Sequence, residues 1–305
     1  MAKKGSIATV PNYTFEPTTN PNIQRVCDMN GDWTHYYLVK EKRYVKAVNH
    51  VLELGHAKGP NFKAYLMRSS AEDVQKKLEE KGDEGSRTHQ AIRELIGGSK
   101  VTMTTKYPSE LHDGRQTILN MDEWENLTGF VNWCNKYQPR VVVCEETMTD
   151  GQTAGTIDAV MVITIPAGDK EFEKEYWGRD VLILIDWKTS ASVWFEYEAQ
   201  TAAYFRFLTK NKEYAKFLKA YNGSIFTGVV RIGTRHKSKY EFTYWSQEVT
   251  EGEHLTRYMA AQIVADRYES QEYVPVIEEI PTQYFIKMPK ATVGGKKKKS
   301  ALKNK

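Results

Sequence analysis

The chain has 305 residues, 40% of them hydrophobic and 27% charged, which is the balance of a soluble globular protein with ample material for a core. No run approaches the roughly 18 apolar residues that a membrane span needs, and Met1–Gly5 lack the apolar stretch of a secretion signal. The three cysteines are scattered without a C-x-x-C pair. This pattern favours reduced thiols in an intracellular, cytoplasmic protein and gives no zinc-binding spacing.

The net charge of +4 is unevenly distributed along the chain. Residues 287–305 hold eight lysines and no acidic residue, so taking these eight charges away leaves a body with a net charge of about −4. The segment 291–305 is expected to be a disordered, lysine-rich tail that solubilises the chain or adds salt-sensitive affinity for DNA. Net charge by itself is therefore no evidence for a nucleic-acid partner.

The first part of the chain is expected to begin with an irregular segment and to carry helical additions. Residues 1–30 contain three prolines and no sustained hydrophobic period, which predicts an irregular segment ahead of a single domain at residues 31–290. Periodicity and capping residues predict helices at 44–54, 69–81, 86–96 and 121–137, and strands at 35–39 and 101–107. Gly82 and Gly85 are expected to separate the second of these helices from the third.

Three apolar, β-branched runs follow, at residues 140–145, 156–163 and 181–188, and they predict neighbouring buried strands. Beyond them, the pattern predicts helices at 196–208 and 253–268 and strands at 224–232 and 240–246. This order predicts an α/β domain in which helices flank a central mixed sheet, with helical additions at the N-terminus.

Each of the three predicted strands carries a carboxylate, at Glu145, Asp158 and Asp186. Side chains alternate across a strand, so Asp186 and Lys188 emerge on the same face. Hard cations such as Mg²⁺ take oxygen ligands, which a cluster of carboxylates supplies. A lysine beside such a metal can orient or deprotonate an attacking water and stabilise charge on a phosphate. The pattern therefore indicates metal-assisted hydrolysis, with a structural Asp–Lys ion pair as the plainer alternative.

The surroundings of these residues resemble the PD-(D/E)XK nuclease superfamily, and more specifically its RecB-type branch, which includes phage exonucleases. The resemblance covers residues 85–205 in the order of the family's signatures, which here read Gly85-Ser86-Arg87-Thr88-His89, Ala154-Gly155-Thr156-Ile157-Asp158, Ile185-Asp186-Trp187-Lys188-Thr189-Ser190 and Gln200-x-x-x-Tyr204. A lone D-x-K is a weak signal, whereas four signatures in the right order are specific. The resemblance implies a restriction-endonuclease-like core.

The resemblance also implies roles for individual residues. One or two Mg²⁺ or Mn²⁺ ions would be bound by His89, Asp158, Asp186 and the backbone carbonyl of Trp187. Lys188 would orient the water, and Glu145 would hold the second ion or that water. Gln200 and Tyr204 would contact DNA or position Lys188, and Arg87 would meet a phosphate or solvent. No iron–sulfur cluster is expected, because no cysteine follows Cys144.

Several of these residues also have other readings. Glu146 adjoins Glu145, and only one of the two can face the site, although the family's glutamate falls best on Glu145. His89 shares a helix face with Ile92 and Ile96, as a core histidine also would. Aromatic side chains at Trp194, Phe195 and Tyr197 would suit stacking on the bases of a single strand, core packing or a helix N-terminal staple.

These observations predict a metal-dependent deoxyribonuclease that degrades DNA from an end and leaves a 5′-phosphate. The alternatives are a structure-specific endonuclease with the same residues, and a non-catalytic DNA-binding or assembly protein. By family resemblance the setting would be recombination, repair or DNA processing in a phage or mobile element of a bacterial host, with a single-strand annealing protein as partner.

Overall fold

The computed structural model describes residues 9–11, 13–40, 43–56, 67–190, 192–269 and 279–281, the first and last of these ranges as backbone alone. The predicted lysine-rich tail at 291–305 lies outside the described residues, as do residues 1–8 of the predicted N-terminal segment. Among the helices of the described ranges, none is both long and apolar enough to cross a bilayer.

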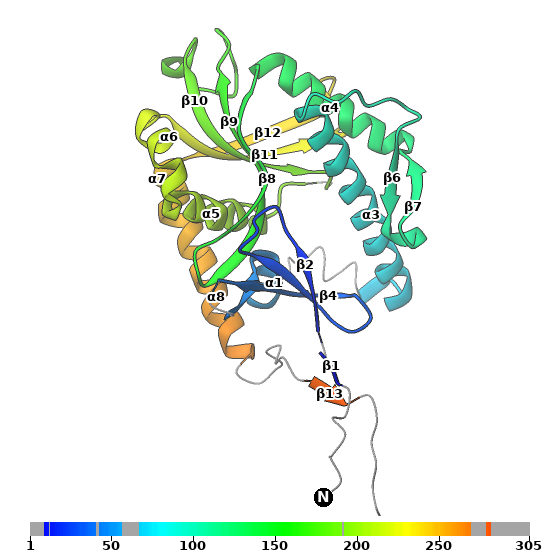
Figure 1. Cartoon of the computed structure of the whole chain (residues 1–305). Helices are drawn as coiled ribbons and strands as arrows, with labels where there is room; N and C mark the ends of the chain where they lie inside the picture. The colour runs from blue at the N-terminus through cyan, green and yellow to red at the C-terminus, as the bar shows by residue number, and fades with distance from the viewer. Residues whose placement is uncertain are drawn as a thin grey trace, which may run out of the picture.

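A mixed nine-stranded sheet forms the centre of the described part of the chain (Figure 1). The strands lie in the order β12-β11-β10-β9-β5-β4-β3-β2, and β8 pairs with β9 beside this path. Their bounds are β2 (Thr14–Pro17), β3 (Gln24–Cys27), β4 (Trp33–Val39), β5 (Arg43–Ala47), β8 (Arg140–Thr149), β9 (Thr153–Thr164), β10 (Asp180–Lys188), β11 (Ile225–Ile232) and β12 (Tyr240–Ser246). The pairs β10–β11 and β5–β9 are parallel, while the other pairs in this sheet are antiparallel.

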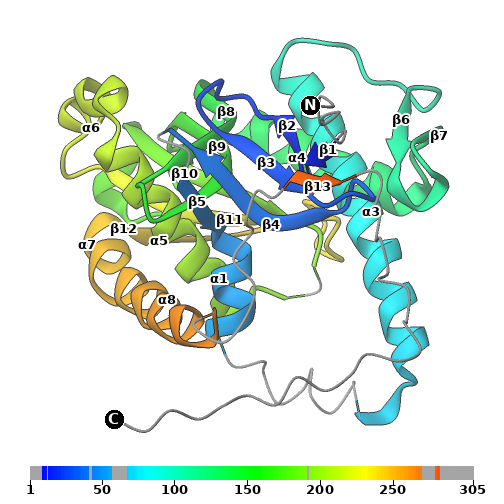
Figure 2. The same cartoon turned by 60° about the horizontal axis from the view of Figure 1, so that its bottom comes forward.

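Helices cover both faces of this sheet (Figures 1 and 2). One face packs against α3 (Ala71–Ile96) and α4 (Met121–Tyr137), and the other packs against α1 (Val48–Gly55), α5 (Phe195–Lys210) and α8 (Leu255–Glu269). The remaining elements are short: α6 (Ala215–Ala220), α7 (Gln247–Val249), a π-helical turn (Thr250–His254), the pair β6 (Lys106–Ser109) and β7 (Arg115–Ile118), and the pair β1 (Thr9–Pro11) and β13 (Glu279–Pro281). The chain is thus an α/β protein with a mixed central sheet flanked by helices.

The strand β10 lies between two apolar cores, as its unbroken apolar run predicts. Ile183, Ile185 and Trp187 join the core beneath α3 and α4, whereas Leu182 and Leu184 join the core beneath α5 and α8. Trp187 is 1% exposed, so its indole is a core side chain. Because both faces of β10 are buried, the polar residues at its end cannot slide to another register without exposing apolar area to water.

The predicted N-terminal region differs from the structure. Residues 14–17 and 24–27, expected to be irregular, form two strands of the main sheet, and residues 44–47, expected to be helical, belong to β5. The additions at the N-terminus are therefore largely strands, and the prediction of helical ones is wrong for this part. These strands have only four or five residues, too few for a period to stand out, and pairing with neighbours rather than local preference holds them.

The helix α3 is a second difference. Residues 71–96 form one continuous helix, although Gly82 and Gly85 predict a break. Glycine costs only about 1 kcal/mol in a helix interior, and this helix buries Arg87, Thr88, Ala91 and Ile92 against the rest of the molecule. Packing therefore overrides the local preference. Ser70 caps the N-terminus by accepting from the backbone N–H of Asp73 at 3.0 Å.

Candidate metal centre

Three potential metal ligands meet at one point, each from a different element. His89 comes from α3, Glu145 from β8 and Asp158 from β9, and one donor atom of each lies within 4.8 Å of the others. The Nδ1 atom of His89 is 3.6 Å from Oδ2 of Asp158 and 3.9 Å from Oε1 of Glu145. An imidazole and two carboxylates converging in a half-buried site form a donor set for a divalent cation.

The backbone of Trp187 holds two members of this group in place. Its N–H donates to Oδ2 of Asp158 at 2.9 Å, and its carbonyl lies 3.1 Å from Nε2 of His89. The Trp187 carbonyl, which is predicted to be a metal ligand, therefore faces Nε2 of His89, whereas the carboxylates face Nδ1. In this arrangement it orients the imidazole and leaves Nδ1 as the atom available to a cation.

The charge state of His89 reflects its neighbours. Burial is the largest influence on the pKa of His89 and lowers it, but the charges of Asp158 and Glu145 outweigh burial and raise the pKa to about 9. The raised pKa favours the protonated imidazole beside the two carboxylates. A cation bound at Nδ1 would take the place of that proton.

The backbone conformation of Glu145 separates it from Glu146. Glu145 has φ of 51°, a left-handed conformation that costs a non-glycine residue roughly 1–3 kcal/mol. Its side chain lies beside His89, whereas Glu146 accepts a hydrogen bond from the hydroxyl of Tyr214 on the other side of the sheet. Of the two adjacent glutamates, the structure brings Glu145 to the group.

Asp186 and Lys188 form a separate ion pair beside the group. The Nζ atom of Lys188 is 2.7 Å from Oδ2 of Asp186, and Asp186 is 1% exposed. Burial raises the pKa of Asp186 to about 6, with Lys188 acting in the opposite direction. Burial lowers the pKa of Lys188, but Asp186 and Asp158 outweigh it and raise the pKa. Lys188 is therefore an ammonium that suits donating to water or a phosphate oxygen more than accepting a proton.

The two residues predicted to support the site lie together under it. Gln200 donates to the hydroxyl of Tyr204 at 3.0 Å, and both are buried in α5. Tyr204 lies against Gly155 so closely that a Cβ at Gly155 would be 2.7 Å from its ring. The glycine of the Gly155–Asp158 segment thus lets the tyrosine ring pack directly against β9 close to Asp158.

Arg87 lies in a buried network away from solvent. It is 8% exposed, and its Nε atom is 2.9 Å from Oε1 of Glu123 and 3.5 Å from Oδ2 of Asp83. A further nitrogen donates to the hydroxyl of Thr117. These contacts favour a structural role that joins α3 to α4, and none of them favours the predicted encounter with a phosphate. The buried carboxylate of Glu123 went unnoticed in the sequence, although its place three residues after Asn120 marks a capping box, which is present.

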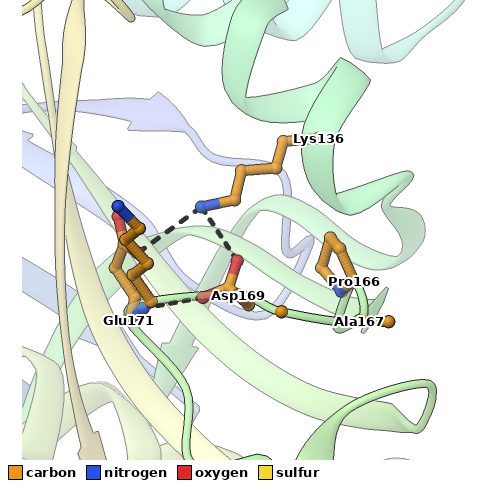
Figure 3. Close-up of a pocket in the computed structure, with 7 residues that line it drawn as sticks. Lys136, Pro166, Ala167, Asp169 and Glu171 are labelled. Carbon is orange, nitrogen blue, oxygen red and sulfur yellow. Dashed lines mark hydrogen bonds and ion pairs between the residues drawn. The ribbon is translucent and has the colours of Figure 1, made fainter.

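A small hollow lies elsewhere, on the connection between β9 and β10 (Figure 3). It has a volume of about 260 Å³ and is lined by Lys136 and residues 166–171. Its charged groups pair with one another, with Nζ of Lys136 2.8 Å from Asp169 and 3.5 Å from Glu171. None of the candidate metal ligands lines it, so it is a surface feature distinct from the metal centre.

Comparison of the sequence with protein-family models gives no match, and comparison with curated proteins gives none either. The assignment of a reaction to this site therefore depends on the residues themselves and on their geometry.

Proposed function

We propose that the protein is a divalent-metal-dependent deoxyribonuclease that hydrolyses phosphodiester bonds from a DNA end. The observation that carries the proposal is the convergence of His89, Glu145 and Asp158 within 4.8 Å, beside the ion pair of Asp186 and Lys188. Taking charges out of water is costly, and three carboxylates and two cationic groups gathered in one place are hard to explain by packing alone. A reaction at a charged phosphate explains all of them.

The donor set suits Mn²⁺ or Mg²⁺. Two carboxylates supply the oxygen ligands that both ions prefer, and an imidazole favours Mn²⁺ over Mg²⁺. His89, Glu145 and Asp158 would hold the ion. Asp186, which is paired with Lys188, would help to hold a second one. Such an ion supplies Lewis-acid stabilisation of the phosphate and a more acidic water.

The remaining steps belong to residues of the chain. The ammonium of Lys188 would donate to the attacking water or to a phosphate oxygen, where negative charge develops. Asp186 holds this ammonium in position at 2.7 Å. Gln200 and Tyr204 support β9 from below, so that Asp158 keeps its place. The proposal that the enzyme acts at DNA ends depends on the resemblance of the four signatures to the RecB-type branch.

The test is digestion of end-labelled linear DNA, single- and double-stranded, with Mg²⁺, Mn²⁺ or EDTA. We expect nucleotides to be lost from one end only with metal, and Lys188→Ala to reduce the rate by roughly 10²–10⁴-fold. Lys219→Ala, which removes an exposed lysine of α6, is the matched control and should cut at the wild-type rate.

Two outcomes would redirect the assignment. A covalently closed single-stranded circle that is cut as fast as a linear strand would indicate an endonuclease. DNA binding without product under any metal would indicate a non-catalytic binding protein.

A further inference from the structure

Two large aromatic side chains are exposed where β10 leads into α5. Trp194 is 40% exposed and Phe195 is 63% exposed, at the N-terminal end of α5. They follow Lys188 by six and seven residues. Burying a side chain of this size contributes about 2–3 kcal/mol to folding, and this pair forgoes much of that contribution.

Tyr197, in the same turn of α5, lies between the pair in sequence and Lys188 in space. The backbone N–H of Tyr197 donates to the carbonyl of Trp194 at 3.0 Å. The ring of Tyr197 in turn lies 4.7 Å from Nζ of Lys188. Tyr197 therefore contacts the lysine of the candidate site from the first turn of α5, which Trp194 and Phe195 begin.

The folded structure does not use the pair in either of the usual ways. Neither ring belongs to the apolar cores beneath the sheet. A helix N-terminal staple would join the residue before the cap to the fourth residue of the helix, and here these are Val193 and the charged Glu198. One face of Phe195 is instead fixed by Arg257, whose guanidinium lies 5.1 Å from the ring centre.

The charges around the pair indicate which part of a nucleic acid it meets. Arg257 is itself paired with Glu198 and Glu253, and Glu196 is the next residue after Phe195. Three carboxylates and one guanidinium leave this surface acidic, which disfavours phosphates. The uncharged face of a base is compatible with such a surface. A duplex buries those faces in its own stack, while an unpaired strand exposes them.

We propose that Trp194 and Phe195 form a stacking platform for unpaired bases next to the scissile phosphate, so that the enzyme holds a single-stranded end. The proposal rests on the proposed function, because it places the platform beside the site that would cut. It deepens that function by naming the substrate class as single-stranded DNA, or a duplex whose terminal nucleotides are frayed.

The test compares wild type with Trp194→Ala, Phe195→Ala and the double variant. Binding of a fluorescent single-stranded oligonucleotide and of a blunt duplex of the same sequence is measured with Ca²⁺ and again with EDTA. A terminal 2-aminopurine reports stacking through its quenching. Tyr268→Ala is the matched control, since Tyr268 is an aromatic residue 56% exposed at the far end of α8.

We expect each single variant to bind the single strand roughly fivefold or more weakly, because a stacked base is worth about 1–3 kcal/mol. Quenching of the 2-aminopurine should fall in the double variant, and duplex affinity should stay within twofold of wild type. Thermal unfolding should remain a single cooperative transition, since neither ring belongs to the apolar cores.

An unchanged single-strand affinity, or an equal loss on the duplex, would overturn the platform. Failure of the proposed function would look different, because wild type would then bind single strands through these rings and release no product with Mg²⁺ or Mn²⁺.

Discussion

At the scale of single residues, the left-handed conformation of Glu145 destabilises the fold but places its carboxylate beside the other candidate ligands. A residue with a Cβ pays roughly 1–2 kcal/mol for this conformation, and glycine pays almost nothing. At an ordinary strand position the order is reversed, since glycine is about 0.5–1 kcal/mol less stable than alanine. We therefore expect the free energy of unfolding of Glu145→Gly to exceed that of Glu145→Ala by about 1 kcal/mol. Urea unfolding in the presence of EDTA measures this difference.

Both Glu145 variants lack the carboxylate, so both should bind Mn²⁺ more weakly than wild type in isothermal titration calorimetry. The same pair of substitutions at Val143, an ordinary residue of β8 with no positive φ, serves as the comparison. If alanine is the more stable substitution at both positions, the backbone at residue 145 is extended and the strain is absent.

A second residue-scale prediction concerns Asp169, at the hollow in Figure 3. Burial raises the pKa of Asp169, but the ion pair with Lys136 and the backbone N–H groups of Phe172 and Glu171 outweigh burial and lower it. A lowered folded pKa contributes stability that is fully present above the unfolded value near 4 and is lost as the pH falls through the folded value.

We accordingly expect Asp169→Asn to lower the free energy of unfolding by about 1–3 kcal/mol at pH 7, and the difference from wild type to shrink steadily below pH 4. Urea unfolding between pH 2.5 and 8 measures it. Glu171→Gln is the control, because Glu171 is more exposed than Asp169 and lies farther from the same lysine, at 3.5 Å instead of 2.8 Å. A difference that is constant over this pH range would mean that the charge of Asp169 contributes nothing.

At the scale of elements, the contact between α3 and α4 determines where His89 lies. Arg87 and His89 are two residues apart on α3 and so point to different sides of it. Arg87 pairs with the fully buried Glu123 of α4, while His89 reaches the metal centre. Removing the charge of Glu123 should loosen α3 and displace the imidazole, because a buried guanidinium that loses a partner is strongly destabilising.

For Glu123→Gln we expect about tenfold weaker Mn²⁺ binding and a loss of about 1–3 kcal/mol in unfolding free energy. Glu79→Gln, at an exposed position on the same helix, should change neither. A variant that loses stability while its Mn²⁺ affinity stays at the wild-type value would show that the ion pair only stabilises the fold and does not position His89.

The same elements show what a sequence can and cannot predict here. The helix at 121–137 and the strand at 240–246 have the bounds that their patterns predict, because their apolar periods are long or their turns well marked. The strands β2, β3 and β5 were missed, since they have only four or five residues and pairing with neighbouring strands specifies them. At the site, the predicted residues include the three candidate ligands, but the left-handed Glu145 and the orientation of His89 toward the Trp187 carbonyl depend on tertiary packing.

At the scale of the whole molecule, the candidate ligands join separate layers. His89 belongs to the helical layer on one face of the sheet, whereas Glu145 and Asp158 belong to the sheet itself. An ion bound by all three would cross-link α3 to β8 and β9, since His89 and Glu145 are 56 positions apart in the chain (145 − 89). Since the unfolded chain lacks this arrangement, an ion that binds only the folded chain raises its free energy of unfolding.

We therefore expect Mn²⁺ at about one hundred times its Kd to stabilise the fold by about 2.7 kcal/mol and to raise Tm by roughly 5 °C. Differential scanning fluorimetry with Mn²⁺ and with EDTA measures the shift. His89→Ala should lose most of the shift, and His112→Ala, which removes an exposed histidine outside the group, should keep it. An equal rise in both variants would place the ion elsewhere on the chain and would remove the observation on which the nuclease proposal depends.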